Sequence, residues 1–349
     1  MSFDENRRRE IILYMLEMVS ADRSDIIRHI TEQFGISTTS VKRYLAKCVD
    51  DRILQEEKTA ECGYRLCSEI TKYECTLQDD TPEEDQIYFD RISPLLTMLP
   101  DTVQDIWAYT CMEILNNAIE HSGGSKLSVT IKQNYLYTEV VITDDGIGAF
   151  ENVRRYMQRE LSREICFEDA VMELYKGKLT TAAANHSGEG IFFSSRMMDQ
   201  FLLSANGTVY IQYADRERLL NNRLLAYYQK LNHIGTMVSM RLSNFSTRDS
   251  RDVFNLYADA EKGFVKTSIP VSDACRTTKV IARSQARRLV RRLEEFEEAV
   301  LDFSEVDFCG QGFADEVFRV FHNAHPETKL TVIHANQDVE RMIRHVGFR

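Results

Sequence analysis

The sequence lacks several patterns by which common protein classes are recognised. No run of apolar residues approaches the roughly 20 residues that cross a bilayer, so no membrane-spanning helix is expected. Eight cysteines are scattered without a CxxC pair, which argues against a zinc site and for reduced thiols. Neither a Gly-x-x-x-x-Gly-Lys-Ser/Thr motif nor a GxGxxG motif is present. A P-loop and a dinucleotide-binding fold are therefore not expected.

Composition sets the remaining bounds. The chain has 349 residues, of which 43% are hydrophobic, enough to bury two or three separate cores. The net charge of −11 suits a protein of the cytoplasm, and the opening residues MSFDENRRRE contain no apolar signal-peptide core. We therefore expect a cytoplasmic α+β protein of several domains without a membrane segment. Whether it forms a homodimer stays open.

Three short motifs predict a nucleotide pocket: EILNN from residue 113, DDGIG from residue 144 and SGEGI from residue 187. Glu113 and Asn117 are four residues apart on a predicted helix, so a carboxylate and an amide oxygen converge on one face. The carboxylate can position or deprotonate a water molecule, and the neutral carbonyl oxygen suits Mg²⁺. Taken alone, this pair also fits the solvated face of an amphipathic helix.

The other two motifs supply a carboxylate and glycines. Asp144 ends a predicted strand, where it can accept a hydrogen bond from an adenine amino group, although DDGIG alone also fits an acidic turn. Glycines leave room for the base and offer backbone amides to phosphates where a helix begins, although a plain loop before a helix is the alternative. The glycines in question are Gly146, Gly148, Gly188 and Gly190.

Together, EILNNAIEH, DDGIG and HSGEGIFFSSRMMD resemble the N box and the two glycine boxes of the GHKL ATPase fold. That fold is shared by gyrase, Hsp90, MutL, sensor histidine kinases and anti-sigma-factor serine kinases, and the short boxes here are most similar to the last two groups. The resemblance covers about residues 73 to 245. It implies a sandwich with helices on one face of a mixed sheet, which binds ATP and Mg²⁺. It also implies a role for each matched residue: Glu113 as general base, Asn117 as Mg²⁺ ligand, Asp144 as the adenine-reading residue, Thr236 near the adenine, and the four glycines in the nucleotide loops.

The insert from about residue 150 to residue 186 would form a lid over the nucleotide. Its middle contains Lys176, Lys178, Thr180 and Thr181, a mixture that can close over phosphates. A surface loop with lysines in solvent is the alternative. His186 is left outside the predicted site.

Residues 1–70 have the pattern of three helices followed by two short strands, which resembles a winged helix-turn-helix domain. The third helix would present hydroxyl and basic side chains to base edges and phosphates. The segment holds 11 Lys and Arg against 13 Asp and Glu, so a protein-interaction or dimerisation module is the alternative. The stretch 37–47 nevertheless contains three bases and no acid. The predicted DNA-binding residues are Thr38, Thr39, Ser40, Lys42, Arg43 and Lys47.

Residues 272–349 alternate helix and strand patterns, which predicts a small α/β domain. The segment VLDFSEVDFCGQGFADEVFR resembles STAS-like domains found beside GHKL kinases. A STAS-like domain implies a protein partner. In phosphorylated relatives a serine follows the LDF strand, whereas the equivalent loop here, residues 309–312, has no hydroxyl and Ser304 lies earlier. The arginines between residues 283 and 292 are interpreted as one side of ion pairs along a single helix. The predicted linkers are residues 67–71 and 262–278.

These predictions define three domains: residues 1–70, 71–262 and 272–349. The leading hypothesis is a DNA-binding transcriptional regulator whose GHKL domain binds, and has the residues to hydrolyse, Mg-ATP. The alternative is a serine/threonine protein kinase of the anti-sigma-factor type that acts on a separate STAS protein. A third hypothesis is a scaffold whose bound nucleotide only holds the fold.

Overall fold

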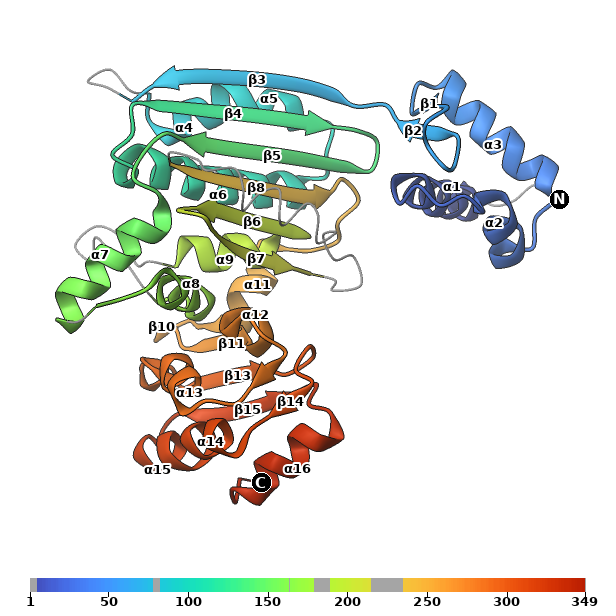
Figure 1. The fold of residues 1–349 in the computed structure, drawn as a ribbon. Helices are drawn as coiled ribbons and strands as arrows, with labels where there is room; N and C mark the ends of the chain where they lie inside the picture. The colour runs from blue at the N-terminus through green and yellow to red at the C-terminus, as the bar shows by residue number, and fades with distance from the viewer. Residues whose placement is uncertain (1–4, 78–81, 163, 179–188, 215–234, 349) are drawn as a thin grey trace. The chain divides into compact units, whose positions relative to one another are not determined.

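The computed structural model describes residues 5–77, 82–162, 164–178, 189–214 and 235–348, and the chain is an α+β protein (Figure 1). It divides into two compact units. The first comprises residues 1–73, 130–140 and 241–246, and the second comprises residues 74–129, 141–240 and 247–349. The N-terminal segment therefore forms a unit with two segments that are distant from it in the sequence.

The N-terminal segment consists of three helices and a short antiparallel strand pair, as predicted. On α3 the apolar residues recur every three or four positions, so that Val41, Leu45 and Cys48 are buried on one face. These side chains share a core with Leu136 and Tyr137 of the same compact unit. The elements are α1 (Glu5–Ser20), α2 (Ile26–Phe34), α3 (Thr38–Asp50), β1 (Leu54–Glu56) and β2 (Tyr64–Leu66).

Six strands form the largest sheet, in the order β3-β4-β5-β8-β6-β7, visible side by side in Figure 1. In β5 every second residue is buried, which is the pattern of a strand that packs on one face. Asn206 and Gly207 connect β6 to β7 by a two-residue turn with positive φ at both positions, as Asn-Gly hairpins require. The strands are β3 (Glu69–Thr76), β4 (Lys126–Gln133), β5 (Tyr137–Asp144), β6 (Gln200–Ala205), β7 (Thr208–Tyr213) and β8 (Thr236–Ser243).

Helices of the second unit pack beside these strands. The described part of the predicted insert contains two helices, α7 and α8. Helix α9 contacts α6, β6 and β7. The helices are α4 (Glu84–Ile87), a π-helical turn (Tyr88–Ile92), α5 (Ser93–Leu96), α6 (Asp101–Asn116), a second π-helical turn (Asn117–His121), α7 (Ala149–Leu161), α8 (Phe167–Lys176), α9 (Gly190–Met197) and α11 (Ser250–Tyr257).

The C-terminal layer, residues 266–348, is built on a parallel three-stranded sheet in the order β11-β13-β15. The prediction of a linker at residues 262–278 is wrong, because β11 and α12 lie within it and β11 pairs with β13. The remaining elements are β9 (Ala258–Asp259), β10 (Gly263–Phe264), β11 (Lys266–Pro270), α12 (Val271–Cys275), β12 (Lys279–Val280), α13 (Arg283–Val290), a 3₁₀ turn (Leu293–Glu295), β13 (Glu298–Asp302), β14 (Phe308–Cys309), α14 (Gln311–Ala314), a π-helical turn (Asp315–Phe321), α15 (His322–Ala324), β15 (Lys329–Ile333) and α16 (Gln337–His345).

Two arginines of α13 are paired, but with acids of another element. Helix α13 ends at Val290, and Arg283 and Arg287 bind Asp315 and Glu316 at 3.0 and 2.9 Å. The prediction of ion pairs along a single helix is therefore wrong for these residues. Among the described residues, no helix is both long and apolar enough to cross a bilayer.

Candidate functional site

Glu113 and Asn117 lie at the junction of α6 and the π-helical turn that follows it, and both are half-buried. The Asn117 side-chain nitrogen donates to the Glu113 backbone carbonyl at 2.8 Å. Within the described part of the chain, this bond uses the amide nitrogen and leaves the Asn117 carbonyl oxygen for a ligand. A neutral oxygen beside a carboxylate is a donor set that fits Mg²⁺.

The start of α9 meets this pair. Gly190, the first residue of α9, packs so closely that a methyl group on its Cα would collide with the Glu113 carboxylate. Burial raises the pKa of Tyr109 well above its ordinary value, and the nearby carboxylates of Glu113 and Glu189 raise it further. The structure thus brings together Glu113, Asn117 and Gly190, three of the predicted nucleotide residues from two separate motifs.

Asp144 occupies a buried position at the end of β5. Its Oδ1 accepts hydrogen bonds from the backbone amides of Gly146 at 2.8 Å and Thr236 at 3.2 Å. Burial raises the pKa of Asp144 above its ordinary value, and the two amides oppose the shift. Asp144, Gly146 and Thr236 are therefore adjacent, although 92 positions separate Asp144 from Thr236.

Glycine is required on both sides of this carboxylate. Gly235 has φ +107°, and a methyl group there would collide with the backbone carbonyl of Asp144. A methyl group on Gly146 would collide with the carbonyl of Ser122, which also accepts the Ile147 amide at 2.9 Å. Because Ser122 follows the π-helical turn of Asn117, these contacts fasten the Asp144 loop to the Glu113 helix.

Two residues that the sequence analysis did not select hold the Asp144 loop in place. Asn206 accepts the Glu151 amide at 3.0 Å and donates to the Ile147 carbonyl at 2.9 Å. A methyl group on Gly148, which has φ +89°, would collide with the Asn206 side chain. Asp145 binds the Ser125 and Lys126 amides at 2.6 and 2.8 Å. The Asn-Gly turn was the signal that could have identified Asn206.

Thr236 has a positioning contact as well as its amide bond to Asp144. Its hydroxyl accepts the backbone amide of Ala149, the first residue of α7, at 2.9 Å. The start of α7 is thereby fixed beside the buried carboxylate.

The lid lysines do not lie where the sequence analysis predicted. Lys176 is 1% exposed, and its ammonium group binds acceptors of α8 and of the C-terminal layer rather than solvent or a phosphate position. Lys178 donates to the Glu295 carbonyl at 2.6 Å. The other predicted lid and loop residues, Thr180, Thr181, His186 and Gly188, lie outside the described residues.

The predicted DNA-contacting face of α3 is largely exposed. Lys42, Arg43 and Lys47 are exposed, as are Thr38 and Thr39. Ser40 is half-buried instead, and its amide and hydroxyl both bind the Ser37 hydroxyl, at 3.2 and 3.0 Å. Ser40 therefore helps to cap α3, and its side chain is less accessible than the prediction assumed.

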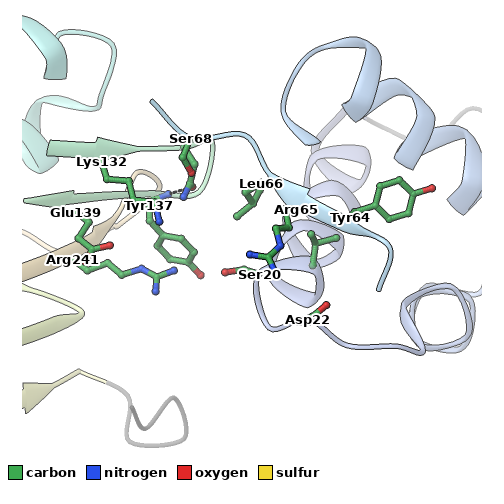
Figure 2. Close-up of a pocket in the computed structure, with 12 residues that line it drawn as sticks. Ser20, Asp22, Tyr64, Arg65, Leu66, Ser68, Lys132, Tyr137, Glu139 and Arg241 are labelled. Carbon is green, nitrogen blue, oxygen red and sulfur yellow. Dashed lines mark hydrogen bonds between the residues drawn. The ribbon is translucent and has the colours of Figure 1, made fainter. Parts of the chain in front are cut away.

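A cavity of about 340 Å³ lies elsewhere in the N-terminal compact unit (Figure 2). Lys132, Tyr137 and Arg241 line it from the sheet strands, and Asp22 and Arg65 line it from the N-terminal segment. The Arg241 guanidinium stacks on the Tyr137 ring, with 3.8 Å between Cζ and the ring centroid. Acidic and basic groups share this cavity, so its charge alone selects no ligand.

The C-terminal layer carries a family signature. Its parallel strands alternate with α13 and α14, and the loop after β14 runs through Gly310, whose amide binds the Val280 carbonyl at 2.8 Å. Residues 285–340 match the STAS-like domain of unknown function, DUF4325. The STAS-like segment thus begins within α13 and ends within α16. A search among curated proteins found no similar sequence.

Proposed function

We propose that the protein is an ATP-responsive regulator that binds DNA through α3 and binds Mg-ATP between α6, α9 and the Asp144 loop, a position that we call the proposed nucleotide cleft. In this proposal the cleft belongs to a GHKL domain and residues 1–70 to a winged helix-turn-helix domain. The observation that carries the proposal is that three distant motifs meet. Gly190 packs on Glu113, and the Ile147 amide of the Asp144 loop binds the Ser122 carbonyl, just after the Glu113 helix, at 2.9 Å.

Each residue has a chemical task in this proposal. Asp144, whose Oδ1 is held by two backbone amides, accepts the adenine amino group through its carboxylate. Asn117 provides a carbonyl oxygen to the Mg²⁺ ion, which neutralises phosphate charge when bound. Glu113 sits beside the start of α9 and orients or deprotonates a water molecule.

The DNA part of the proposal rests on the exposed cations of α3. Lys42, Arg43 and Lys47 are exposed on a helix that the buried residues Val41 and Leu45 hold in place. Basic side chains on one exposed helix face supply phosphate contacts, and the neighbouring hydroxyls of Thr38 and Thr39 suit base edges.

The test is duplex binding by the full chain with Mg-ATP, with Mg-ADP and without nucleotide. We expect different affinities for a random-sequence duplex in the three conditions, because only ATP offers a γ-phosphate to the cleft. Arg43→Ala should weaken binding and lower the salt dependence by about one phosphate contact. Arg8→Ala makes the same change at an exposed position of α1 and serves as the control.

Equal affinity in all three conditions would refute nucleotide control of DNA binding. Equal loss in Arg43→Ala and Arg8→Ala would refute the assignment of α3 as the DNA-binding element.

A further inference from the structure

Helix α9 connects the proposed nucleotide cleft to the C-terminal layer. Its first residue, Gly190, contacts the Glu113 carboxylate. In its last turn, Arg196 donates to the Ser268 carbonyl of β11 at 2.8 Å and stacks on the Phe192 ring, with 3.4 Å between Cζ and the ring centroid. One helix of eight residues therefore touches the cleft at one end and the C-terminal layer at the other.

Helix α8 is fastened to the same layer by a buried lysine. The Lys176 ammonium group donates to the carbonyls of Arg288 at 3.0 Å and Arg291 at 2.6 Å, and to the Glu173 carboxylate at 2.8 Å. In return, the Thr267 hydroxyl of β11 donates to the Lys176 carbonyl at 2.9 Å. All three ammonium protons thus have an acceptor, as a buried charge requires.

A second set of contacts surrounds this lysine. Arg292 donates to the Lys178 carbonyl at 2.8 Å and lies 3.4 Å from the second carboxylate oxygen of Glu173. Lys178 in turn donates to the Glu295 carbonyl at 2.6 Å, and its ammonium lies 4.5 Å from the centroid of the Phe296 ring. We call this set of contacts around Lys176, together with the Lys176 bonds themselves, the Lys176 joint.

The contacts of the Lys176 joint should form or break together. Opening it would leave Lys176 and Glu173, each about 2% exposed, without their partners across the interface. Lys176 and Glu173 would still pair with each other on α8, but the ammonium group would lose two of its three acceptors. Buried donors without acceptors are unfavourable, so a half-open arrangement is disfavoured and the joint is either complete or separated.

Helices α8 and α9 pack closely against each other where α8 ends. Gly177 ends α8 with φ +95°, and a methyl group there would collide with the Phe192 ring of α9. A shift of α9 at the cleft therefore displaces Gly177, and with it the adjacent Lys176. This path runs entirely through described residues of one compact unit.

We propose that the Lys176 joint couples nucleotide occupancy of the cleft to the packing of the C-terminal layer. This inference rests on the proposed ATP binding and adds to it the element that responds. Coupling between two sites is reciprocal, so a change that opens the joint also changes the affinity for ATP. The STAS-like segment is then the part of the chain whose exposure reports the nucleotide state.

The experiment compares the full chain with its Lys176→Met variant by calorimetry with Mg-ATP and by hydrogen exchange of residues 283–295. Methionine keeps the apolar stem of the lysine and removes its three donors. In the wild type, Mg-ATP should change the exchange rates of residues 283–295 relative to the nucleotide-free chain. In Lys176→Met this response should be lost and the ATP affinity should change by about 5-fold or more, the usual lower range of allosteric coupling.

Two further variants complete the design. Lys279→Met makes the same substitution at an exposed lysine of the C-terminal layer and should leave both measurements unchanged. Thr267→Val removes only the hydroxyl bond to Lys176, and it should reduce the exchange response in part even if Lys176→Met fails to fold.

The outcomes separate the two proposals. If the wild type binds ATP while the exchange of residues 283–295 ignores it, the coupling is refuted and ATP binding stands. If the wild type binds no ATP, the proposed function is refuted and the coupling with it.

Discussion

Asp144 and Asp145 are neighbours in one motif, but they lie in different surroundings. Asp144 is buried, with its Oδ1 bound to the amides of Gly146 and Thr236. Asp145 accepts the Ser125 amide and hydroxyl and the Lys126 amide, and so closes a turn. Substituting each by asparagine should therefore separate nucleotide affinity from stability.

For Asp144→Asn we expect a loss of ATP affinity without a loss of stability. The asparagine oxygen can keep both backbone bonds, which turns the NH₂ group, a donor, toward the adenine amino group, also a donor. A hydrogen bond to a charged group contributes about 1.5–3 kcal/mol, so binding should weaken about 10- to 150-fold. Because burial disfavours the charged carboxylate, the neutral amide should leave the free energy of unfolding unchanged or raise it.

For Asp145→Asn the expectation is reversed. The amide provides one acceptor oxygen in place of two, so the Ser125 turn loses at least one charge-assisted bond, and the midpoint of thermal unfolding should fall. ATP affinity should change less than in Asp144→Asn. Calorimetry with Mg-ATP and thermal unfolding of both variants measure the two effects. Equal ATP affinity of wild type and Asp144→Asn would show that this carboxylate does not contact the base.

Three further predictions follow from the same geometry. The raised pKa of Asp144 means that this carboxyl takes up its proton at a higher pH than an ordinary aspartate. ATP affinity should therefore decrease as the pH falls through this raised pKa, and calorimetry over a pH series should show a flatter profile for Asp144→Asn. Folding stability depends on pH in the opposite direction to ATP affinity. Because the pKa of Asp144 is higher in the folded chain, its contribution to stability is fully present below the unfolded pKa and is lost as the pH rises through the folded pKa. Gly190→Ala should remove ATP turnover, measured as phosphate release, because the added methyl group would displace the Glu113 carboxylate. The higher helix propensity of alanine should offset the cost of this displacement to stability. Turnover equal to wild type would contradict the placement of Glu113. Asn206→Gly keeps a residue suited to positive φ but loses the bonds to Glu151 and Ile147, so it should cost about 1–3 kcal/mol in chemical denaturation, and an unchanged midpoint would show that Asn206 does not hold the Asp144 loop.

The sequence pattern predicted helices and strands well where the element has one buried face and one exposed face. The spacing of Val41, Tyr44, Leu45 and Cys48 is that of a helix with one buried side, and α3 has that form. The alternation in β5 likewise placed Asp144 at the end of a strand. The resemblance to STAS-like domains is confirmed for residues 285–340. The winged helix and the GHKL domain stay predictions.

Contacts between distant segments could not be predicted in this way. The sequence around Lys176 is typical of a solvated loop, yet its ammonium group is buried against the carbonyl groups of Arg288 and Arg291, more than 100 positions later. The segment 262–278 contains mixed polar residues, and only its pairing with β13 makes β11 a strand. The Asn-Gly turn that contains Asn206 can be recognised in the sequence, but the hydrogen bond from Asn206 to the Ile147 carbonyl cannot. Each of these depends on where another part of the chain folds.

The discontinuous N-terminal unit has a practical consequence for anyone who cuts the chain. Leu136 and Tyr137 are buried in the core of α1–α3, and Phe245 packs against it. A protein shortened to begin at residue 71 would therefore expose more of these three side chains to water. Full burial of one apolar side chain contributes about 1.5–3 kcal/mol, which Leu136 and Tyr137 would largely lose. Such a fragment should self-associate, and the isolated segment 1–70 should in turn melt more easily than it does within the intact chain.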